Sequence, residues 1–385
     1  MLSRRSFIRS CGAASTLGAF GFPHMAFARA ATERRFVFII QRGAADGLSI
    51  LAPMGDPQFA AIRGDFAQDS ANGAKLDGFF TLHPALAETA KMYAARQALF
   101  VHAVASPYRD RSHFDGQNVL ETGSSAAYRL KDGWMNRLLG LIAPSEAKAL
   151  ALSSTVPMAL RGSHEVSSYA NSQLPSPSDD LLARVGALYE TDPQLHELWT
   201  AAIETRMKAG DAMHSGGGQK GSATGALAAK MLLGDGARIA MIETSGWDTH
   251  SGQRGRLNAQ LRDLDQMLAA LMTGLGAEWQ NTLVLVATEF GRTARPNGTG
   301  GTDHGQASAA MLLGGAASGG KIVADWPGLS QAALYEGRDL KPTMDLDALI
   351  AGALAQHYAT DPGRVMASLF PESRGTVVRQ PLVVA

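Results

Sequence analysis

The sequence predicts an α/β protein built on a doubly wound, mostly parallel β-sheet. Short, continuously apolar runs recur at residues 36–40, 98–104, 238–242 and 282–287, as is typical of strands buried on both faces of a sheet. Between the last two runs, leucines recur every three or four residues over 257–271, which is the pattern of an amphipathic crossover helix. This alternation of strand and helix favours the doubly wound arrangement.

The first thirty residues have the layout of an export signal and are set apart from the fold. Arg4 and Arg5 precede a weakly apolar run over residues 11–22, and Ala28-Arg29-Ala30 has the small-x-small pattern that a signal peptidase accepts. We therefore predict a twin-arginine signal over residues 1–30, with the twin-arginine translocase as partner during export. The mature chain would then be periplasmic or secreted.

Charge and cysteine usage argue against nucleic-acid binding and against membrane anchoring. Residues 1–30 hold four arginines and no acid, so their removal leaves 31 basic and 35 acidic residues, a net charge of about −4. Such a charge gives no electrostatic footprint for nucleic acid. The apolar run is too short to span a bilayer. Because Cys11 stands at the start of that run rather than after it, and no other cysteine follows, we expect neither a stable membrane anchor nor a disulfide.

One stretch of the predicted 31–385 domain differs from the rest. Residues 162–236 are polar, rich in glycine around 216–221, and lack strand signals. Helical patterns at 181–189 and 195–208 predict a mainly helical insertion. We expect it to cap the carboxyl edge of the sheet.

Polar residues gather next to the apolar runs, where open α/β sheets place their active sites. Carboxylates and imidazoles without cysteine suit zinc, manganese, iron or magnesium. Singly, each has an ordinary explanation, since Asp-Thr-His after a strand is often a turn and a helix cap. Their common position at one sheet edge favours a metal site with the candidate ligands Asp46, Asp248, His250, Glu289, Asp303 and His304.

Ser112 is the candidate nucleophile. It stands just before a predicted helix over 113–121, where free backbone N–H groups bind anions. Arg109 and Arg111 beside it favour a phosphate or sulfate group, and we group Ser112 with Arg109 and His113 as catalytic candidates. The alternative is a plain N-cap, because Ser112 and Asp115 approximate a capping box.

These segments resemble the exported bacterial family known as domain of unknown function 1501, within the alkaline-phosphatase-like superfamily. The resemblance covers nearly the whole mature chain. It implies adjacent metal ions, a serine or threonine nucleophile, and hydrolysis of phosphate or sulfate esters. It rests on Arg42-Gly43-Ala44-Ala45-Asp46-Gly47-Leu48, Leu82-His83-Pro84-Ala85-Leu86, Arg111-Ser112-His113-Phe114-Asp115, Gly246-Trp247-Asp248-Thr249-His250, Thr288-Glu289-Phe290-Gly291-Arg292-Thr293 and Gly301-Thr302-Asp303-His304-Gly305.

The resemblance further implies one or two divalent ions, zinc or manganese first. Ser112 or a metal-bound water would attack an anionic ester or saccharide substrate. The superfamily's strand-end Thr-x-Asp-His-Gly matches Thr302-Asp303-His304-Gly305 by letter and Thr288-Glu289-Phe290-Gly291 by position. In the second match, which strand order favours, Phe290 replaces a metal histidine and a second metal site would be lost. The alternative function is a noncatalytic carbohydrate-binding or envelope-assembly protein on the same fold.

Overall fold

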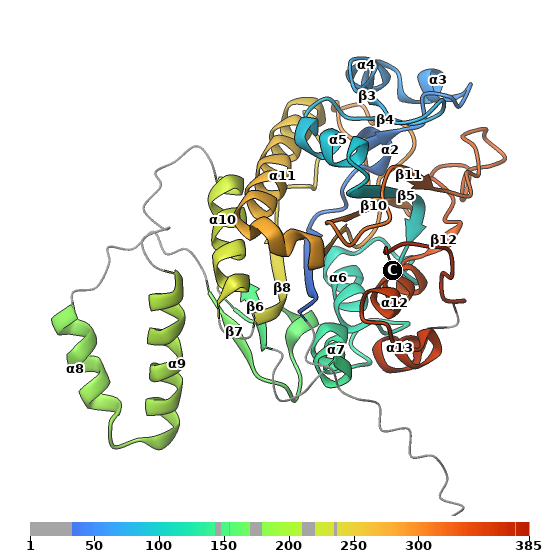
Figure 1. The fold of residues 1–385 in the computed structure, drawn as a ribbon. Coiled ribbons are helices and arrows are strands. Elements are labelled where there is room, and N and C mark those ends of the chain that lie inside the picture. The colour runs from blue at the N-terminus through green and yellow to red at the C-terminus, as the bar shows by residue number, and fades with distance from the viewer. Residues whose placement is uncertain are drawn as a thin grey trace, which may run out of the picture. The chain divides into compact units, whose positions relative to one another are not determined.

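The computed structural model describes residues 33–142, 148–153, 155–169, 179–209, 220–234, 237–373 and 375–384. The predicted export signal lies outside these residues. Within them, the central sheet has nine strands in the order β11-β5-β10-β9-β1-β8-β6-β7, and β12 pairs with β5 (Figure 1). The strands are β1 (Arg35–Gln41), β5 (Ala98–Ala105), β6 (Lys148–Leu152), β7 (Val166–Ser168), β8 (Ala237–Thr244), β9 (Thr282–Ala287), β10 (Ser308–Leu313), β11 (Lys321–Val323) and β12 (Met344–Asp345).

The sheet is mostly parallel, which confirms the predicted fold class. Strand β1 lies between β8 and β9 and runs parallel to both. Strand β10 is antiparallel to both of its neighbours, β5 and β9. The four apolar runs of the sequence are β5, β1, β8 and β9, whose residues are largely buried.

Several strands were not expected from the sequence, and β6 and β7 are the ones that extend the sheet beyond β8. Strand β6 consists largely of alanine and leucine, and β7 lies inside the stretch that lacked strand signals. Strand β7 is a short edge strand whose Ser167 and Ser168 are exposed. An exposed edge strand of three residues needs no run of apolar side chains, so its sequence carries no strand pattern.

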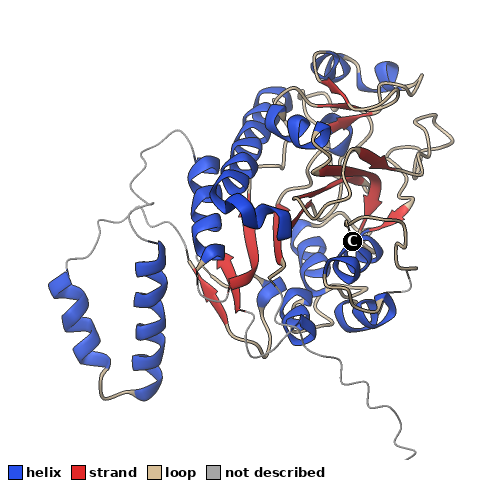
Figure 2. Ribbon diagram, in the orientation of Figure 1, coloured by secondary structure: helices blue, strands red, loops and turns tan. Residues whose placement is uncertain are grey.

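Helices cover both faces of the sheet (Figure 2). They are α5 (Ala87–Ala94), α6 (His113–Thr122), α7 (Trp134–Ile142), α10 (Lys220–Leu233), α11 (Gln253–Leu275), α12 (Leu346–His357) and α13 (Pro362–Leu369). Shorter pieces are α2 (Gly47–Ile50), α3 (Phe59–Arg63), α4 (Asp65–Ala71), the 3₁₀ segments Met158–Leu160 and Gly276–Asn281, and a small sheet of β2 (Leu51–Ala52), β4 (Thr81–Leu82) and β3 (Ala74–Lys75). None of the described helices is both long and apolar enough to cross a bilayer.

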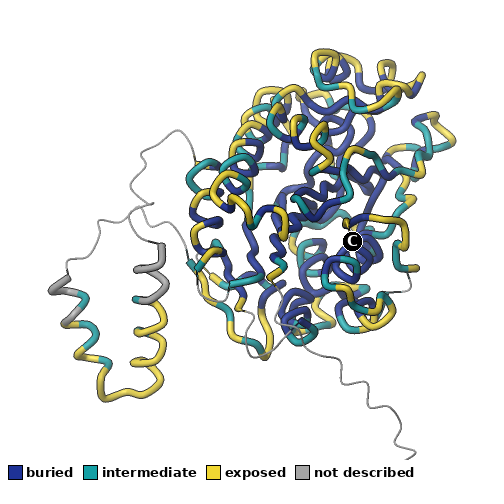
Figure 3. The backbone as a smooth tube through the Cα atoms, viewed as in Figure 1, coloured by how far each residue is buried: buried dark blue, intermediate teal, exposed yellow. Residues whose placement is uncertain are grey.

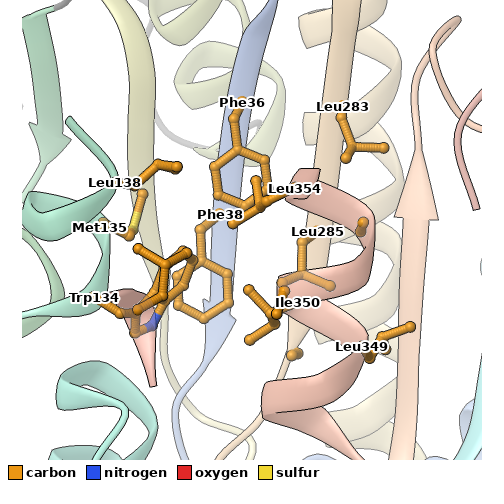
Figure 4. Packing of buried hydrophobic residues seen from close by; sticks show 14 of the residues in the cluster. Phe36, Phe38, Trp134, Met135, Leu138, Leu283, Leu285, Leu349, Ile350 and Leu354 are labelled. Carbon is orange, nitrogen blue, oxygen red and sulfur yellow. The ribbon is translucent and has the colours of Figure 1, made fainter. Parts of the chain in front are cut away.

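Alternate residues of β1 enter two separate cores, as the pleat of a strand requires. Phe36 and Phe38 pack with Trp134 of α7 and with α12, and the Phe38 and Trp134 ring centroids are 5.4 Å apart (Figure 4). Val37 and Ile39 pack instead with α10 and α11. The strands are accordingly buried throughout the middle of the fold (Figure 3). The two cores together therefore fix the position of the sheet and of its edges.

The predicted insertion contains three described helices, α8 (Asp179–Tyr189), α9 (Pro193–Ala209) and α10. The helical patterns at 181–189 and 195–208 fall on α8 and α9, whose Tyr189 and Trp199 rings contact each other. Helix α10 packs tightly on α11, since a Cβ on Gly225 would lie 2.1 Å from the Met267 carbonyl oxygen. Helix α10 is thus part of a layer on the sheet, and a cap formed by α8 and α9 stays a prediction.

Candidate metal centre

One edge of the sheet is formed by the carboxyl ends of β1, β5, β8 and β9 together with the amino end of β10. Because β10 is antiparallel, its first residue, Ser308, pairs with Val104 near the end of β5. His304 lies four residues before that strand. It is thereby brought to the loops that follow β8 and β9, although it precedes its own strand.

Close packing of two loops helps to shape this edge. Gly43, just after β1, has a φ of +118°, and a Cβ there would lie 2.5 Å from the backbone nitrogen of Asp248. Any other residue would therefore push the loop after β8 away from β1. Glycine is therefore required at position 43 by the close packing of the two loops, whatever reaction the site carries out.

Three side chains of this edge form a group that can hold a metal ion. Ligand atoms of His113, Asp248 and His304 all lie within 4.8 Å of one another. The Nε2 atom of His304 is 3.3 Å from Asp248 Oδ1, and the Nε2 atom of His113 is 3.5 Å from Asp248 Oδ2. His250 joins the group, because its Nε2 atom lies 3.1 Å from Asp248 Oδ1 and 3.0 Å from His304 Nε2.

The other ring nitrogen of each histidine faces a hydrogen-bond acceptor. His113 Nδ1 is 2.8 Å from Glu289 Oε1, His250 Nδ1 is 3.0 Å from Asp303 Oδ1, and His304 Nδ1 is 2.9 Å from the carbonyl oxygen of Arg111. Carbonyl and carboxylate oxygens only accept, so each Nδ1 carries the proton. In the neutral rings the Nε2 lone pairs are then left facing the group. Histidines that bind metals are held in this way.

A cation fits the atoms that remain unpaired. The Nε2 atom of His113 is buried and has no hydrogen-bond partner. The Nε2 atoms of His250 and His304 face each other at 3.0 Å, which two lone pairs do not favour. A divalent ion shared by these imidazoles and Asp248 would satisfy all of them.

The surroundings of the group favour the ligand forms of Asp248 and His304, but they favour the protonated ring of His113 in the absence of metal. Burial opposes ionisation, but the guanidinium of Arg292 lowers the pKa of Asp248, to which its Nη1 atom donates at 2.7 Å. Burial also lowers the pKa of His304 and so favours its neutral ring. The hydrogen bond to Glu289 raises the pKa of His113.

Glu289 and Asp303 hold histidines instead of joining the ligand group. Glu289 is fully buried and also accepts from the backbone N–H of Gly43 at 2.9 Å and from Gln117 Nε2 at 3.1 Å. Burial opposes ionisation, yet these hydrogen bonds, with that of His113 first, lower the pKa of Glu289. Both carboxylates were expected as ligands. Their places next to the strands could not reveal that a histidine stands between them and the group.

Asp46 does not join the group either. Its carboxylate forms a buried ion pair with Arg63 and accepts from Ser49 Oγ at 2.8 Å. Burial opposes ionisation, but Arg63 lowers the pKa of Asp46. Asp46 was expected to bind metal because it follows β1. The arginine of α3 that neutralises it could not be paired with it from sequence.

The three catalytic candidates lie in different surroundings. His113 stands in the ligand group, a role that sequence reasoning missed because the direction of its ring depends on the rotation of α6. Ser112 is the N-cap residue of α6, but its side chain makes no capping hydrogen bond. The capping box that Ser112 and Asp115 suggested is therefore not formed in the structure.

The guanidinium of Arg109 is held by backbone carbonyl oxygens. Its Nη1 atom donates to the carbonyl oxygens of Ser106 and Tyr108, in the latter case at 2.7 Å. Its side chain lines a cavity of ≈ 710 Å³ to which no ligand-group residue contributes. Arg111 is bound by Asp339 and Glu336. Neither arginine is therefore placed as a phosphate clamp, whereas Arg292, which sequence reasoning left without a role, contacts the group.

Several solved structures are similar to this chain. The periplasmic domain of EcEptC from Escherichia coli, in complex with Zn, has 11% identity and a TM-score of 0.40, with 93% of each chain covered. The alkaline phosphatase of the Antarctic bacterium TAB5 has 13% identity and a TM-score of 0.37, covering 76% of this chain and 95% of the other. The phosphonate monoester hydrolase of Agrobacterium radiobacter has 10% identity and a TM-score of 0.36, covering 75% and 70%.

All three TM-scores are below 0.5, so these likenesses decide nothing about the activity of this chain. No curated protein has a significantly similar sequence. A match to a protein family is informative, in contrast to these likenesses. The sequence model of the family described as "Protein of unknown function (DUF1501)" matches residues 33–370. The match covers most of the chain and includes every residue of the ligand group, so this protein belongs to the DUF1501 family.

Proposed function

We propose that the protein is an exported, metal-dependent hydrolase of phosphate or sulfate esters. The observation that carries the proposal is the convergence of three imidazole Nε2 atoms on Asp248, each ring being held through its Nδ1 atom. The export part of the proposal rests on the twin-arginine motif at Arg4 and Arg5. Replacing Arg4 and Arg5 by lysine should leave the precursor in the cytoplasm, and undiminished export of that variant would remove this part of the proposal.

The metal ligands proposed here are His113, Asp248, His250 and His304. Three imidazoles and one carboxylate suit zinc best, with manganese as the alternative. Among the described residues, one group of this kind comes together, so we propose a single ion. Such an ion, when bound, polarises the anionic group of the ester as a Lewis acid.

The chain's own groups would bind and attack the substrate. The free N–H groups in the first turn of α6 favour an anionic oxygen at that helix terminus. The hydroxyl of Ser112, at the same terminus, would attack phosphorus or sulfur. A bond from Oγ forms while the bond to the ester oxygen breaks, the hydroxyl proton ends on the leaving alcohol, and water later releases the oxyanion from Ser112.

A noncatalytic saccharide-binding function is the second candidate, and one observation favours it. The ≈ 710 Å³ cavity beside Arg109 has a polar lining that includes the side chains of Ser125, Ser373 and Glu372. Hydroxyl and carboxylate groups of this kind suit a polyhydroxylated ligand. In that case the ligand group would have a structural role.

The test is hydrolysis by the mature protein after loading with zinc or manganese. The substrates are p-nitrophenyl phosphate and p-nitrophenyl sulfate, and the variant is Asp248→Ala, which should lose both bound metal and turnover. The matched control is His196→Ala, because His196 is exposed on α9 and should leave both unchanged. If the metal-loaded protein hydrolyses neither ester, the hydrolase proposal fails for these substrate classes and the binding function becomes the better account.

A further inference from the structure

A buried chain of hydrogen bonds leads from the ion pair of Asp46 and Arg63 to the candidate ligand Asp248. Gln253 Nε2 donates to Asp46 Oδ2. Gln253 Oε1 accepts from Thr302 Oγ1 at 2.6 Å and from Thr249 Oγ1 at 3.0 Å. Thr302 Oγ1 in turn accepts from Arg292 Nε at 3.1 Å, and Arg292 then donates to Asp248.

The direction of every bond in this chain follows from its buried end. Asp46, ionised beside Arg63, only accepts, so the amide nitrogen of Gln253 must face it. The amide oxygen then faces the threonines, and the hydroxyl hydrogen of Thr302 must point at that oxygen. A lone pair of Thr302 Oγ1 is therefore left for Arg292 Nε. The chain has no freedom to reverse.

The same residues hold the guanidinium of Arg292 at two points. Its Nε atom donates to the hydroxyl of Thr302 and its Nη2 atom to the carbonyl oxygen of Thr302. This leaves Nη1 to bind Asp248 Oδ1, while Asp248 Oδ2 is the oxygen nearer to His113 Nε2. All of the linking side chains are at most 2% exposed, so no water replaces a lost partner easily.

We propose that Thr302 is a positioning residue of the metal centre. Its hydroxyl, oriented by Gln253 and Asp46, fixes Arg292, and Arg292 fixes the carboxylate of Asp248 with one oxygen toward His113. The inference rests on the proposed function, since it assigns Asp248 as a metal ligand. It also gives a role to Asp46, which follows β1 but lies outside the ligand group.

Thr302→Val is the direct test, and Thr249→Val is its matched control. Both variants remove a hydroxyl that donates to the same amide oxygen of Gln253, but only Thr302 also binds Arg292. We expect Thr302→Val to weaken Zn²⁺ binding by about 10- to 100-fold, as is usual for groups that hold metal ligands. Thr302→Ser, which keeps the hydroxyl, and Thr249→Val should bind Zn²⁺ nearly as the wild type does.

The measurement is the Zn²⁺ dissociation constant by competition with a chromophoric chelator. The urea midpoint of each metal-free variant is recorded as well, because a merely structural role would lower stability without separating the two threonines in affinity. Equal Zn²⁺ affinity of Thr302→Val and Thr249→Val would overturn the positioning role. Absence of Zn²⁺ binding by the wild type would instead contradict the proposed function. Thr302→Ala and Thr249→Ala repeat the comparison with smaller side chains if valine prevents folding.

Discussion

Each histidine of the ligand group is held by the ring nitrogen that faces away from the others. The acceptors are of two kinds, a carboxylate for His113 and His250 and a backbone carbonyl for His304. That carbonyl belongs to Arg111, whose φ of 60° is uncommon for a residue other than glycine. Such a conformation persists only where its surroundings hold it, which is frequent at functional sites. Ser112, the next residue, is therefore presented by a constrained turn.

Ser112→Ala should remove most turnover while leaving folding nearly intact. The side chain makes no capping hydrogen bond, so its loss should cost less than the usual ~1 kcal/mol of an N-cap. Single-turnover kinetics on any ester that the wild type hydrolyses, with metal content measured in parallel, check the prediction. Wild-type rates from a metal-replete Ser112→Ala variant would assign the attack to water and end the nucleophile role of Ser112.

The buried, neutral imidazole of His102 should make the free energy of unfolding decrease as the pH falls. Burial lowers the pKa of His102 to about 4, and its Nε2 atom lies 2.9 Å from the carbonyl oxygen of Leu51. In the unfolded chain a histidine has a pKa near ~6.5. Between these values the unfolded state binds a proton that the folded state does not, so stability falls as the pH falls from ~6.5 to about 4.

The measurement compares urea unfolding of the wild type and of His102→Gln at several pH values in that window. Carboxylates titrate in both proteins, so the difference between the two isolates His102. The wild type should lose more stability on acidification than the variant does. Parallel pH profiles would mean that His102 is not held neutral.

Three of the four residues of the ligand group could be predicted as ligands from sequence, but His113 and the division of roles between ligands and supporting residues could not. Asp248, His250 and His304 were expected as ligands, and all three meet. Glu289 and Asp303 have the same chemistry and nearly the same positions along the chain, yet they support histidines. What separates the two classes is the direction of each side chain, which depends on packing between segments far apart in sequence.

At the scale of single elements, periodicity decided what could be foreseen. The apolar runs became β1, β5, β8 and β9, and the leucine stripe became α11, because these patterns are local and long enough to read. The antiparallel direction of β10 has no such signal. Direction is set by pairing with β5 and β9, and it is this direction that brings His304 to the site.

Helix α11 offers a matched test of that stripe. Leu261 is fully buried against the sheet side of the helix, and the adjacent Arg262 is exposed. Leu261→Ala should lower the free energy of unfolding by about 2–5 kcal/mol through loss of buried surface and a residual cavity. Arg262→Ala should change it by less than about 0.5 kcal/mol. Urea unfolding of both variants gives the comparison, and similar costs would contradict the assigned packing face.

At the scale of the whole molecule, the apolar residues that stabilise the fold and the polar residues of the candidate site occupy different parts of the structure. Two apolar cores on opposite faces hold the sheet, while the polar side chains of the ligand group gather at one edge. The buried ion pair of Asp46 and Arg63 is linked to the ligand group through the hydrogen bond that Gln253 donates to Asp46. The range that matches the family, residues 33–370, therefore includes both the group that would bind metal and the residues that hold it in place.

Metal binding by the purified mature chain tests the central claim most directly. The metal-free wild type, its His304→Ala variant and the exposed-histidine control His196→Ala are each titrated with Zn²⁺ and analysed for metal content. One ion per chain in the wild type and the control, together with at least about a 10-fold weaker affinity in His304→Ala, is the expected result. A wild type that binds no Zn²⁺ or Mn²⁺, or a His304→Ala variant that binds as tightly as the control, would contradict the metal centre.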